Sequence, residues 1–289
     1  TAKALTVSGI TASNKTYDGG TNATLDSSSV LYNGLVSGDT FTGSYSGVFA
    51  NANVGTSKTV NITSSYSGSD VDNYSVTDQS STTADISAKA LTATASASNK
   101  VYDGSSAAST TLTLSGLIGS ETLTSTTSSS FNNKNVGAGK TVTVNSINLA
   151  NGSNGGSAAN YSISSGQTTT ANITAKPLTV SGITASNKIY DSTKTATTTL
   201  SFSGLIGSET INNSNSSTFD NKNIGTGKTV TVNSISLVDG SNGGLASNYS
   251  ISSGQTTTAN VSARPLTVSN ISASNKSYDG TKSVALDTS

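Results

Sequence analysis

The chain of 289 residues carries 15 basic and 15 acidic side chains, so its formal net charge is zero. It has no cysteine, histidine, methionine or tryptophan, which excludes disulfides, cysteine or histidine metal centres and imidazole acid–base catalysis. The balanced charge also lacks the basic surface expected of a nucleic-acid-binding protein, and no run approaches the eighteen or so apolar residues needed for membrane insertion.

Serine and threonine dominate the composition, with 57 and 47 residues, whereas 10% of residues are charged and 32% are hydrophobic. Disordered chains usually combine low hydrophobicity with high net charge and few aromatic residues. Ten tyrosines, five phenylalanines and zero net charge therefore favour a folded, strand-rich, secreted protein. Because the sequence begins mid-pattern at Thr1, without a signal peptide, we expect it to be part of a longer chain with its targeting and anchoring signals elsewhere.

An internal repeat organises the sequence. The segment SNKTYDG at residues 13–19 returns as SNKVYDG at 98–104, SNKIYDS at 186–192 and SNKSYDG at 274–280. Two further markers follow in constant order: a Phe-to-Lys-Thr-Val run that begins at Phe49, Phe131 and Phe219, and an Asn-Tyr-Ser strand that begins at Asn73, Asn160 and Asn248. Solenoid coils repeat every twenty to fifty residues, so a unit of about 87 residues indicates a whole small domain. We predict domains at 1–87, 88–174 and 175–262, followed at 263–289 by the start of a truncated fourth repeat.

Within each repeat the pattern is typical of β-strands. Apolar residues alternate with threonine, serine or asparagine at 111–114, 228–232 and 259–263. Turn dipeptides separate such runs, and they stand at 33–34, 151–152, 155–156, 243–244 and 279–280. No segment combines helical periodicity with caps. The sequence therefore predicts an all-β chain of tandem antiparallel β-sandwich domains of immunoglobulin-like size, arranged as a rod.

The junctions between repeats predict a stiff connection. Ala84 and Ile86 share one face of a strand, and the next apolar residue, Leu91, has the opposite parity; the same change follows Ile173 and Val261. We infer that one extended segment leaves one core and enters the next without a flexible linker. Four basic residues mark these crossings and two prolines stiffen them: Lys3, Lys89, Lys176 and Arg264, with Pro177 and Pro265.

No catalytic constellation is evident, so we expect neither enzymatic activity nor a cofactor. The Lys-x-Tyr-Asp groups, such as Lys15, Tyr17 and Asp18, contain potential acids and bases. Their recurrence in every repeat favours a tyrosine packed under a turn whose aspartate accepts hydrogen bonds from backbone N–H groups. An isopeptide crosslink between Lys140 or Lys228 and an asparagine of the following strand stays open as an alternative.

The first repeat differs from the others. Its net charge is −4, whereas the second, third and fourth segments carry +2, +1 and +1. Asp70, Asp72 and Asp78 are candidate calcium ligands, because calcium needs convergent oxygens, although the alternative of a solvated acidic loop is open. Three tyrosines have no counterpart in the other repeats, and they are candidates for a partner surface or for this repeat's own core: Tyr32, Tyr45 and Tyr66.

The order of the SNKxYDG segment, the Asn-Val-Gly…Lys-Thr-Val run, the Asn-Tyr-Ser strand and the Ala-x-Ile-x-Ala-Lys-x-Leu-Thr junction resembles the tandem YDG-type domain of very large bacterial surface proteins. The resemblance covers essentially the whole chain, with Ser192 departing from the glycine of the motif. It implies filamentous-haemagglutinin-like or biofilm adhesins that are exported to the cell surface, where such domains serve as stalks, and it implies no catalytic residues.

The expected function is therefore a structural stalk of an extracellular bacterial adhesin or surface fibre. The expected partners are neighbouring repeats of the same chain. One alternative is a subunit of a self-assembling filament or sheath, in which other copies of the chain complete a repeat by strand exchange. Another is that the repeats themselves bind surface glycans.

Overall fold

A computed structural model describes residues 1–287. These residues form strands, turns and three short 3₁₀ segments but no α-helix, which confirms the predicted all-β class. By their contacts they group into two compact units. The first unit comprises residues 1–100 and 105–173, and the second comprises residues 101–104 and the chain from residue 174 onward.

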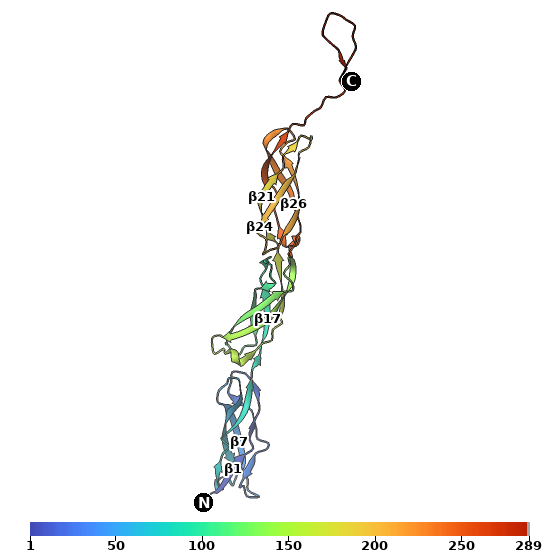
Figure 1. The fold of residues 1–289 in the computed structure, drawn as a ribbon. Helices are drawn as coiled ribbons and strands as arrows, with labels where there is room; N and C mark the ends of the chain where they lie inside the picture. Colours follow the sequence, from blue (N-terminus) through green and yellow to red (C-terminus); the bar gives the residue numbers. More distant parts are fainter. Residues whose placement is uncertain (288–289) are drawn as a thin grey trace. The chain divides into compact units, whose positions relative to one another are not determined.

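The first repeat is a sandwich of two sheets (Figure 1). A three-stranded sheet has the order β6-β1-β9, and a five-stranded sheet has the order β3-β10-β8-β7-β4. Strand β1 of the first sheet and β7 of the second are labelled in Figure 1. Leu5, Val7 and Phe41 are buried between them. The elements are β1 (Lys3–Ser8), β2 (Thr11–Ala12), β3 (Lys15–Thr16), β4 (Asn22–Ala23), β5 (Leu25–Asp26), β6 (Leu31–Asn33), β7 (Thr42–Phe49), β8 (Gly55–Ser67), η1 (Val71–Asn73), β9 (Tyr74–Thr77) and β10 (Ser81–Ser87).

The second repeat follows the same plan. Its two long strands, β16 and β17, pair antiparallel from Leu123 opposite Asn151 to Phe131 opposite Val142. Alternate residues of β17 point inward, so that Val142 and Val144 are fully buried and alternate with Thr141, Thr143 and Asn145. The elements are β11 (Lys89–Ala90), β12 (Thr92–Ala97), β13 (Lys100–Val101), β14 (Ala107–Ala108), β15 (Thr110–Ser115), β16 (Leu123–Phe131), β17 (Gly137–Asn151), η2 (Ala158–Asn160), β18 (Tyr161–Ser162) and β19 (Thr168–Thr174).

The third repeat matches the second almost element by element. Its five-stranded sheet has the order β22-β28-β26-β25-β23, and Val230 and Val232 of β26 are buried where β17 buries its two valines. The elements are β20 (Lys176–Pro177), β21 (Thr179–Ala185), β22 (Lys188–Ile189), β23 (Thr195–Ala196), β24 (Thr198–Ser203), β25 (Ile211–Phe219), β26 (Gly225–Asp239), η3 (Ala246–Asn248), β27 (Tyr249–Ser250) and β28 (Thr256–Ser262).

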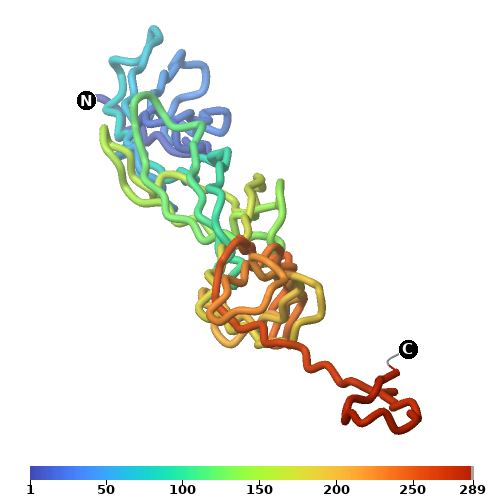
Figure 2. Tube along the Cα trace, turned by 90° about the horizontal axis from the view of Figure 1, so that it is seen from above, coloured from blue at the N-terminus to red at the C-terminus, as the bar shows by residue number. Residues whose placement is uncertain are grey.

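Beyond residue 262 the chain leaves the third repeat as a single segment and ends in a small loop (Figure 2). One short antiparallel pair closes this loop, β29 (Ser272–Ala273) with β30 (Leu286–Asp287). Its side chains are exposed, and Tyr278 of the fourth motif is 98% exposed. A fourth core is therefore not formed by residues 263–287.

The sandwiches are not purely antiparallel. The strand that enters the first repeat, β1, runs parallel to β9, and β3 runs parallel to β10. The later repeats reproduce these parallel pairs in β11 with β18, β20 with β27 and β22 with β28. Alternation in sequence shows which face of a strand is buried but not the direction of its neighbour, so the prediction missed these parallel edges.

The connection between the first and second repeats is extended, as the change of parity predicted. Strand β10 belongs to the five-stranded sheet of the first repeat, and after Ala88 the chain continues directly into β11, which pairs with β18 of the second repeat. The Leu91 amide then donates to the Ser162 carbonyl at 2.8 Å. Ala84, Ile86 and Leu91 lie in one buried cluster with Tyr17 and Tyr161, so the cores of the two repeats are continuous.

Candidate functional site

The SNKxYDG motif forms a turn held by its lysine. Lys15 Nζ donates to Asp18 Oδ1 and the Gly20 carbonyl, both at 2.8 Å, and to the Asn22 carbonyl at 3.2 Å. The same amino group lies 5.5 Å from the centre of the Phe49 ring. Asp18 also accepts the Gly20 amide at 2.8 Å. The lysine therefore organises the loop around the buried phenylalanine.

The turn recurs in the other repeats. Lys188 Nζ donates to Asp191 and to the carbonyls of Thr193 and Thr195, and Lys276 repeats the contact with Asp279. The hydrogen bond from Lys188 is the main reason that the pKa of Asp191 falls to about 2. The ionised carboxylate accepts the hydrogen bonds that shape the turn, as in the predicted arrangement of the motif.

The motif tyrosine of the first repeat reaches into the second repeat. Tyr17 Oη donates to Glu121 Oε1 at 2.6 Å, and Tyr161 Oη donates to Glu121 Oε2 at 2.7 Å. The two rings meet edge to face, with centroids 5.4 Å apart. The two oxygens of one carboxylate thus accept hydrogen bonds from tyrosines of two consecutive repeats. We call Tyr17, Glu121 and Tyr161 the first joint.

Burial and the glutamate change the acidity of these hydroxyls. Desolvation, followed by the hydrogen bond to Glu121, raises the pKa of Tyr17 to about 12. The same two causes raise the pKa of Tyr161. Both tyrosines are therefore neutral donors over the physiological range, and hydrogen bonds to an ionised acceptor are among the stronger ones in proteins.

A second set of hydrogen bonds connects the first and second repeats beside the first joint. Asn160 is 1% exposed; its Oδ1 accepts the Val54 amide and its Nδ2 donates to Asn53 Oδ1, both at 3.0 Å. Asn53 and Val54 belong to the Asn-Val-Gly run of the first repeat, whereas Asn160 opens the Asn-Tyr-Ser strand of the second. Three sequence markers of the repeat therefore meet at one place.

The second unit contains the same arrangement, which we call the second joint. Tyr102 Oη donates to Glu209 Oε1 at 2.7 Å, and Tyr249 Oη donates to Glu209 Oε2 at 2.6 Å. The ring centroids are 5.5 Å apart, again edge to face. Desolvation and Glu209 raise the pKa of Tyr249 to about 12. Glu209 itself is 8% exposed.

Each joint requires a glycine at the last position of the motif. Gly19 and Gly104 both have φ of +78°, which strains any residue with a Cβ. A Cβ at Gly19 would lie 3.0 Å from Ile118 Cγ2, and one at Gly104 would lie 2.7 Å from Ile206 Cγ2. The motif glycine therefore allows both the turn and the close approach of the isoleucine.

Sequence reasoning missed the glutamates of the joints. Glu121 and Glu209 stand in loops before β16 and β25, and neither lies in a repeated marker that we had recognised. The first repeat has Asp39 at the same place, where it accepts Tyr74 Oη at 2.6 Å. An acidic residue at one position of all three repeats was the signal that could have identified it.

The acidic candidates of the first repeat have protein partners. Asp70 Oδ2 accepts the Thr40 amide and Ser69 Oγ, both at 2.9 Å, Asp78 accepts the Tyr66 hydroxyl, and Asp72 is exposed in η1. Within residues 1–287 no three carboxylates gather into a group that would hold a metal ion. The arrangement gives the predicted calcium site no support.

The three tyrosines special to the first repeat lie around Phe41. Tyr32 and Tyr66 contact its ring with centroids 5.2 and 5.0 Å away, and Tyr45 packs against Tyr66. Tyr45 Oη also donates to Tyr32 Oη at 3.0 Å. All three are partly buried in this repeat's own core, and a partner surface at these residues stays a prediction.

The lysines considered for isopeptide bonds contact an asparagine of the preceding loop. Lys140 Nζ donates to Asn133 Oδ1 and Lys228 Nζ to Asn221 Oδ1, each at 2.7 Å. The asparagines of the following strand accept backbone amides instead, as Asn172 does from Gly139. The lysine amino groups are therefore hydrogen-bonded to the preceding loop, and a crosslink to the following strand stays a prediction.

Comparison with known proteins gives one family. The family model described as YDG domain matches residues 1–84, 87–171 and 174–259. Among curated proteins, none is similar enough in sequence to count as a relative. The solved I9–I11 tandem from titin aligns with 89% of this chain and 98% of its own at 11% identity, but its TM-score of 0.22 is too low to support any argument. In residues 1–287 no helix has the length and hydrophobicity to cross a membrane.

Proposed function

Because the chain belongs to the YDG domain family over most of its length, we propose that it is a shaft segment of an extracellular bacterial adhesin or surface fibre. Its role is mechanical and not catalytic: it holds a binding region away from the cell. The partners of each repeat are its neighbours in the chain.

One observation carries the proposal, namely that Glu121 accepts hydrogen bonds from Tyr17 of one repeat and Tyr161 of the next. Hydrogen bonds to a charged group contribute roughly 1.5–3 kcal/mol each when their partners are shielded from water. Bending the chain between the two repeats would break the Tyr17–Glu121 hydrogen bond and separate the Tyr17 ring from the Tyr161 ring. Two repeats that share a carboxylate and a continuous core therefore resist hinge motion.

The connecting segment supports the same conclusion. From β10 to β12 the backbone is extended and hydrogen-bonded, with no run of glycine or serine that would act as a flexible linker. An exported shaft also benefits from the lack of cysteine, because its stability does not depend on redox state. The extracellular location rests on the resemblance to bacterial surface proteins and on this composition.

Small-angle scattering of residues 1–289 tests the mechanical role. Each repeat should extend roughly 30–40 Å, so the three should give a maximum dimension of at least roughly 90–120 Å with little flexibility. The matched control is the double variant Glu121→Ala/Glu209→Ala, which should become flexible while each repeat stays folded. A compact or freely hinged wild-type particle would contradict the shaft.

A separate experiment addresses location. Antibodies raised against residues 1–262 should bind intact producing cells without permeabilisation, and protease added outside should remove the signal. Binding only after lysis would exclude an extracellular role without affecting the joints.

A further inference from the structure

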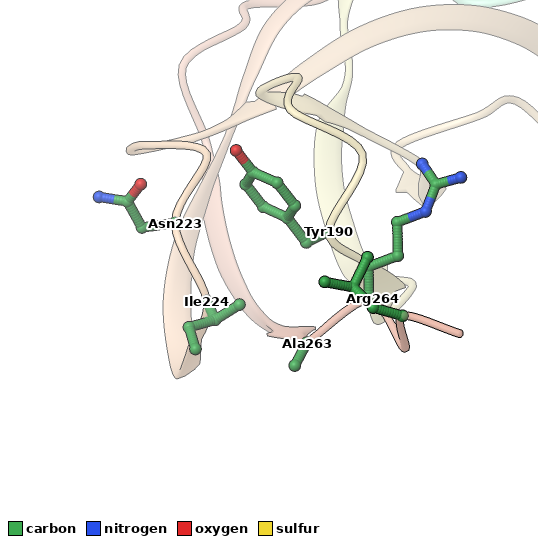
Figure 3. Close-up of a pocket in the computed structure, with 6 residues that line it drawn as sticks. Tyr190, Asn223, Ile224, Ala263 and Arg264 are labelled. Carbon is green, nitrogen blue, oxygen red and sulfur yellow. The ribbon is translucent and has the colours of Figure 1, made fainter. Parts of the chain in front are cut away.

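The third repeat has an open cavity at the position where the first repeat contacts its neighbour through the first joint. The cavity has a volume of about 510 Å³, and Figure 3 shows the Tyr190 ring beside it. The lining residues are Tyr190, Asn223, Ile224, Ala263, Arg264 and Leu266. By the order of the repeat markers, Tyr190 corresponds to Tyr17, Asn223 and Ile224 to Asn53 and Val54, and Leu266 to Leu91.

The two sets of residues differ in burial. Leu91 is 6% exposed and Leu266 is 87% exposed. Tyr17 is 5% exposed whereas Tyr190 is only partly buried, and Ile224 is 61% exposed. The same residue types are therefore covered in one place and open to solvent in the other.

The backbone of the open end is already in the form found in the joints. The Tyr190 amide donates to the Ser262 carbonyl at 2.9 Å, as the Tyr17 amide does to Ser87. Lys188 lies 5.5 Å from the Phe219 ring centre, as Lys15 does from Phe49. The motif turn is thus preorganised without a neighbour, and only the partner groups that Glu121, Asn160 and Tyr161 supply in the first joint are missing.

We propose that this cavity is the docking site for the leading end of a further YDG repeat, one that continues in the same chain from Leu266. The carboxylate of that repeat accepts the Tyr190 hydroxyl, and the asparagine of its Asn-Tyr-Ser strand accepts the Ile224 amide. Arg264 adds a positive charge beside the incoming carboxylate. The inference extends the joint used in the proposed function, but it does not depend on an extracellular location.

Continuity with the filled joints selects this occupant. Leu266 corresponds in sequence to Leu91 and Leu178, which are each 6% exposed. The amides of those two leucines donate to the carbonyls of Ser162 and Ser250, the serines of the Asn-Tyr-Ser strands in their own repeats. Leu266 becomes buried only when the rest of its own repeat folds over it. A repeat that continues from Leu266 meets this condition and brings its carboxylate to Tyr190 at the same time.

Ser192 sets a limit on the fit. It replaces the motif glycine and keeps a φ of +63°. At the equivalent positions, a Cβ added to Gly19 or Gly104 would lie 3.0 or 2.7 Å from an isoleucine Cγ2 of the next repeat. The corresponding side chain of the incoming repeat must shift by a few tenths of an ångström. Docking should therefore be weaker here than in the first joint, and Ser192→Gly should strengthen it.

The test is an extended chain in which residues 1–266 are followed by a second copy of residues 179–289, so that Arg264 and Leu266 are kept. Amide hydrogen exchange at Ile224 is the readout, because its counterpart Val54 donates to Asn160 at 3.0 Å in the first joint. The Ile224 amide should exchange on the order of tenfold more slowly in the extended chain than in the 289-residue chain. Ser192→Gly should slow the exchange further.

Asn248→Ala placed only in the added copy is the control. It removes the acceptor for the Ile224 amide and should restore fast exchange at Ile224, while slow exchange of Val230 in the added copy shows that this copy is folded. If that variant unfolds the added copy, Tyr190→Ala in the original third repeat removes the hydroxyl that donates to the incoming carboxylate, and it should also speed the exchange of the Ile224 amide.

Equal exchange of the Ile224 amide in the two chains, with the added copy folded, would overturn the proposal and leave the scattering test of the shaft untouched. Concentration-dependent protection of Ile224 in the 289-residue chain would assign the cavity to a second copy and would also overturn it.

Discussion

The first joint and the open end of the third repeat contain the same residue types in different surroundings. Tyr17 lies under the second repeat with its hydroxyl on Glu121, whereas Tyr190 borders a cavity. The local turn is alike in both, with the lysine bonded to the aspartate of its motif at 2.8 Å. The YDG sequence therefore forms the turn without a neighbour, whereas burial of its tyrosine depends on the next repeat.

The largest contrast is expected when the motif tyrosine is removed. Tyr17→Ala deletes a ring that packs in two repeats and should destabilise the first repeat by about 3–5 kcal/mol. Tyr190→Ala deletes a partly exposed ring and should cost clearly less, about 1 kcal/mol. Native-state hydrogen exchange of the buried Val60 and Val230 amides measures the two effects separately. Equal losses would show that the neighbour adds nothing.

Leucine truncation should sharpen the same comparison. Leu91→Ala creates a cavity in the continuous core. It should lower the free energy of unfolding, measured by amide exchange at Val60 and Val142, by about 2–4 kcal/mol. Leu266→Ala removes a side chain that is exposed in this chain, and its effect should lie within about 0.5 kcal/mol of zero. A large effect of Leu266→Ala would mean that residues 263–287 already pack on the third repeat.

The motif glycine offers a smaller contrast. Gly19→Ala places a Cβ at φ +78° and 3.0 Å from Ile118, and it should destabilise the first joint by about 1–2 kcal/mol. Ser192→Ala changes neither φ nor the presence of a Cβ, so it should be nearly neutral. Exchange of the Val54 amide, which donates to Asn160, reports on the first joint directly. Unchanged protection in Gly19→Ala would contradict the close approach.

Alkaline pH should weaken the joints selectively. The pKa of Tyr17 is raised from 10.0 to about 12, so the folded state retains a proton that the unfolded state loses. The contribution of Tyr17 to stability is therefore complete below pH 10 and is lost as the pH rises from 10 to about 12. In urea unfolding, wild type should lose more stability over this range than Tyr17→Phe. Parallel pH profiles for wild type and Tyr17→Phe would contradict this.

Sequence reasoning could predict the repeat, the strands and the extended junction, because each leaves a periodic signal in the chain. The change of parity between Ile86 and Leu91 is a local property of the backbone, and the structure has the extended junction, with both side chains buried and β10 followed directly by β11. The parallel pairing of β1 with β9 was not predictable in this way, because direction depends on how the chain crosses between sheets.

The candidate site was harder to predict for a physical reason. Tyr17 was expected under its own turn, and the turn exists, but its hydroxyl bonds a residue 104 positions away. Glu121 stands in a loop without periodicity, where nothing in the local sequence distinguishes a buried acceptor from a solvated carboxylate. Conversely, Tyr32, Tyr45 and Tyr66 were candidates for a partner surface because the other repeats have no counterpart of them, and they lie around the core residue Phe41.

A double-mutant cycle between Tyr17→Phe and Glu121→Gln isolates the free energy of the one hydrogen bond by which the carboxylate joins the first two repeats. We expect a coupling free energy of about 1–2 kcal/mol in the exchange of the Val60 amide, and none between Tyr190→Phe and Glu121→Gln. Additive effects of Tyr17→Phe and Glu121→Gln would show that the carboxylate does not hold the repeats together, and would contradict the account.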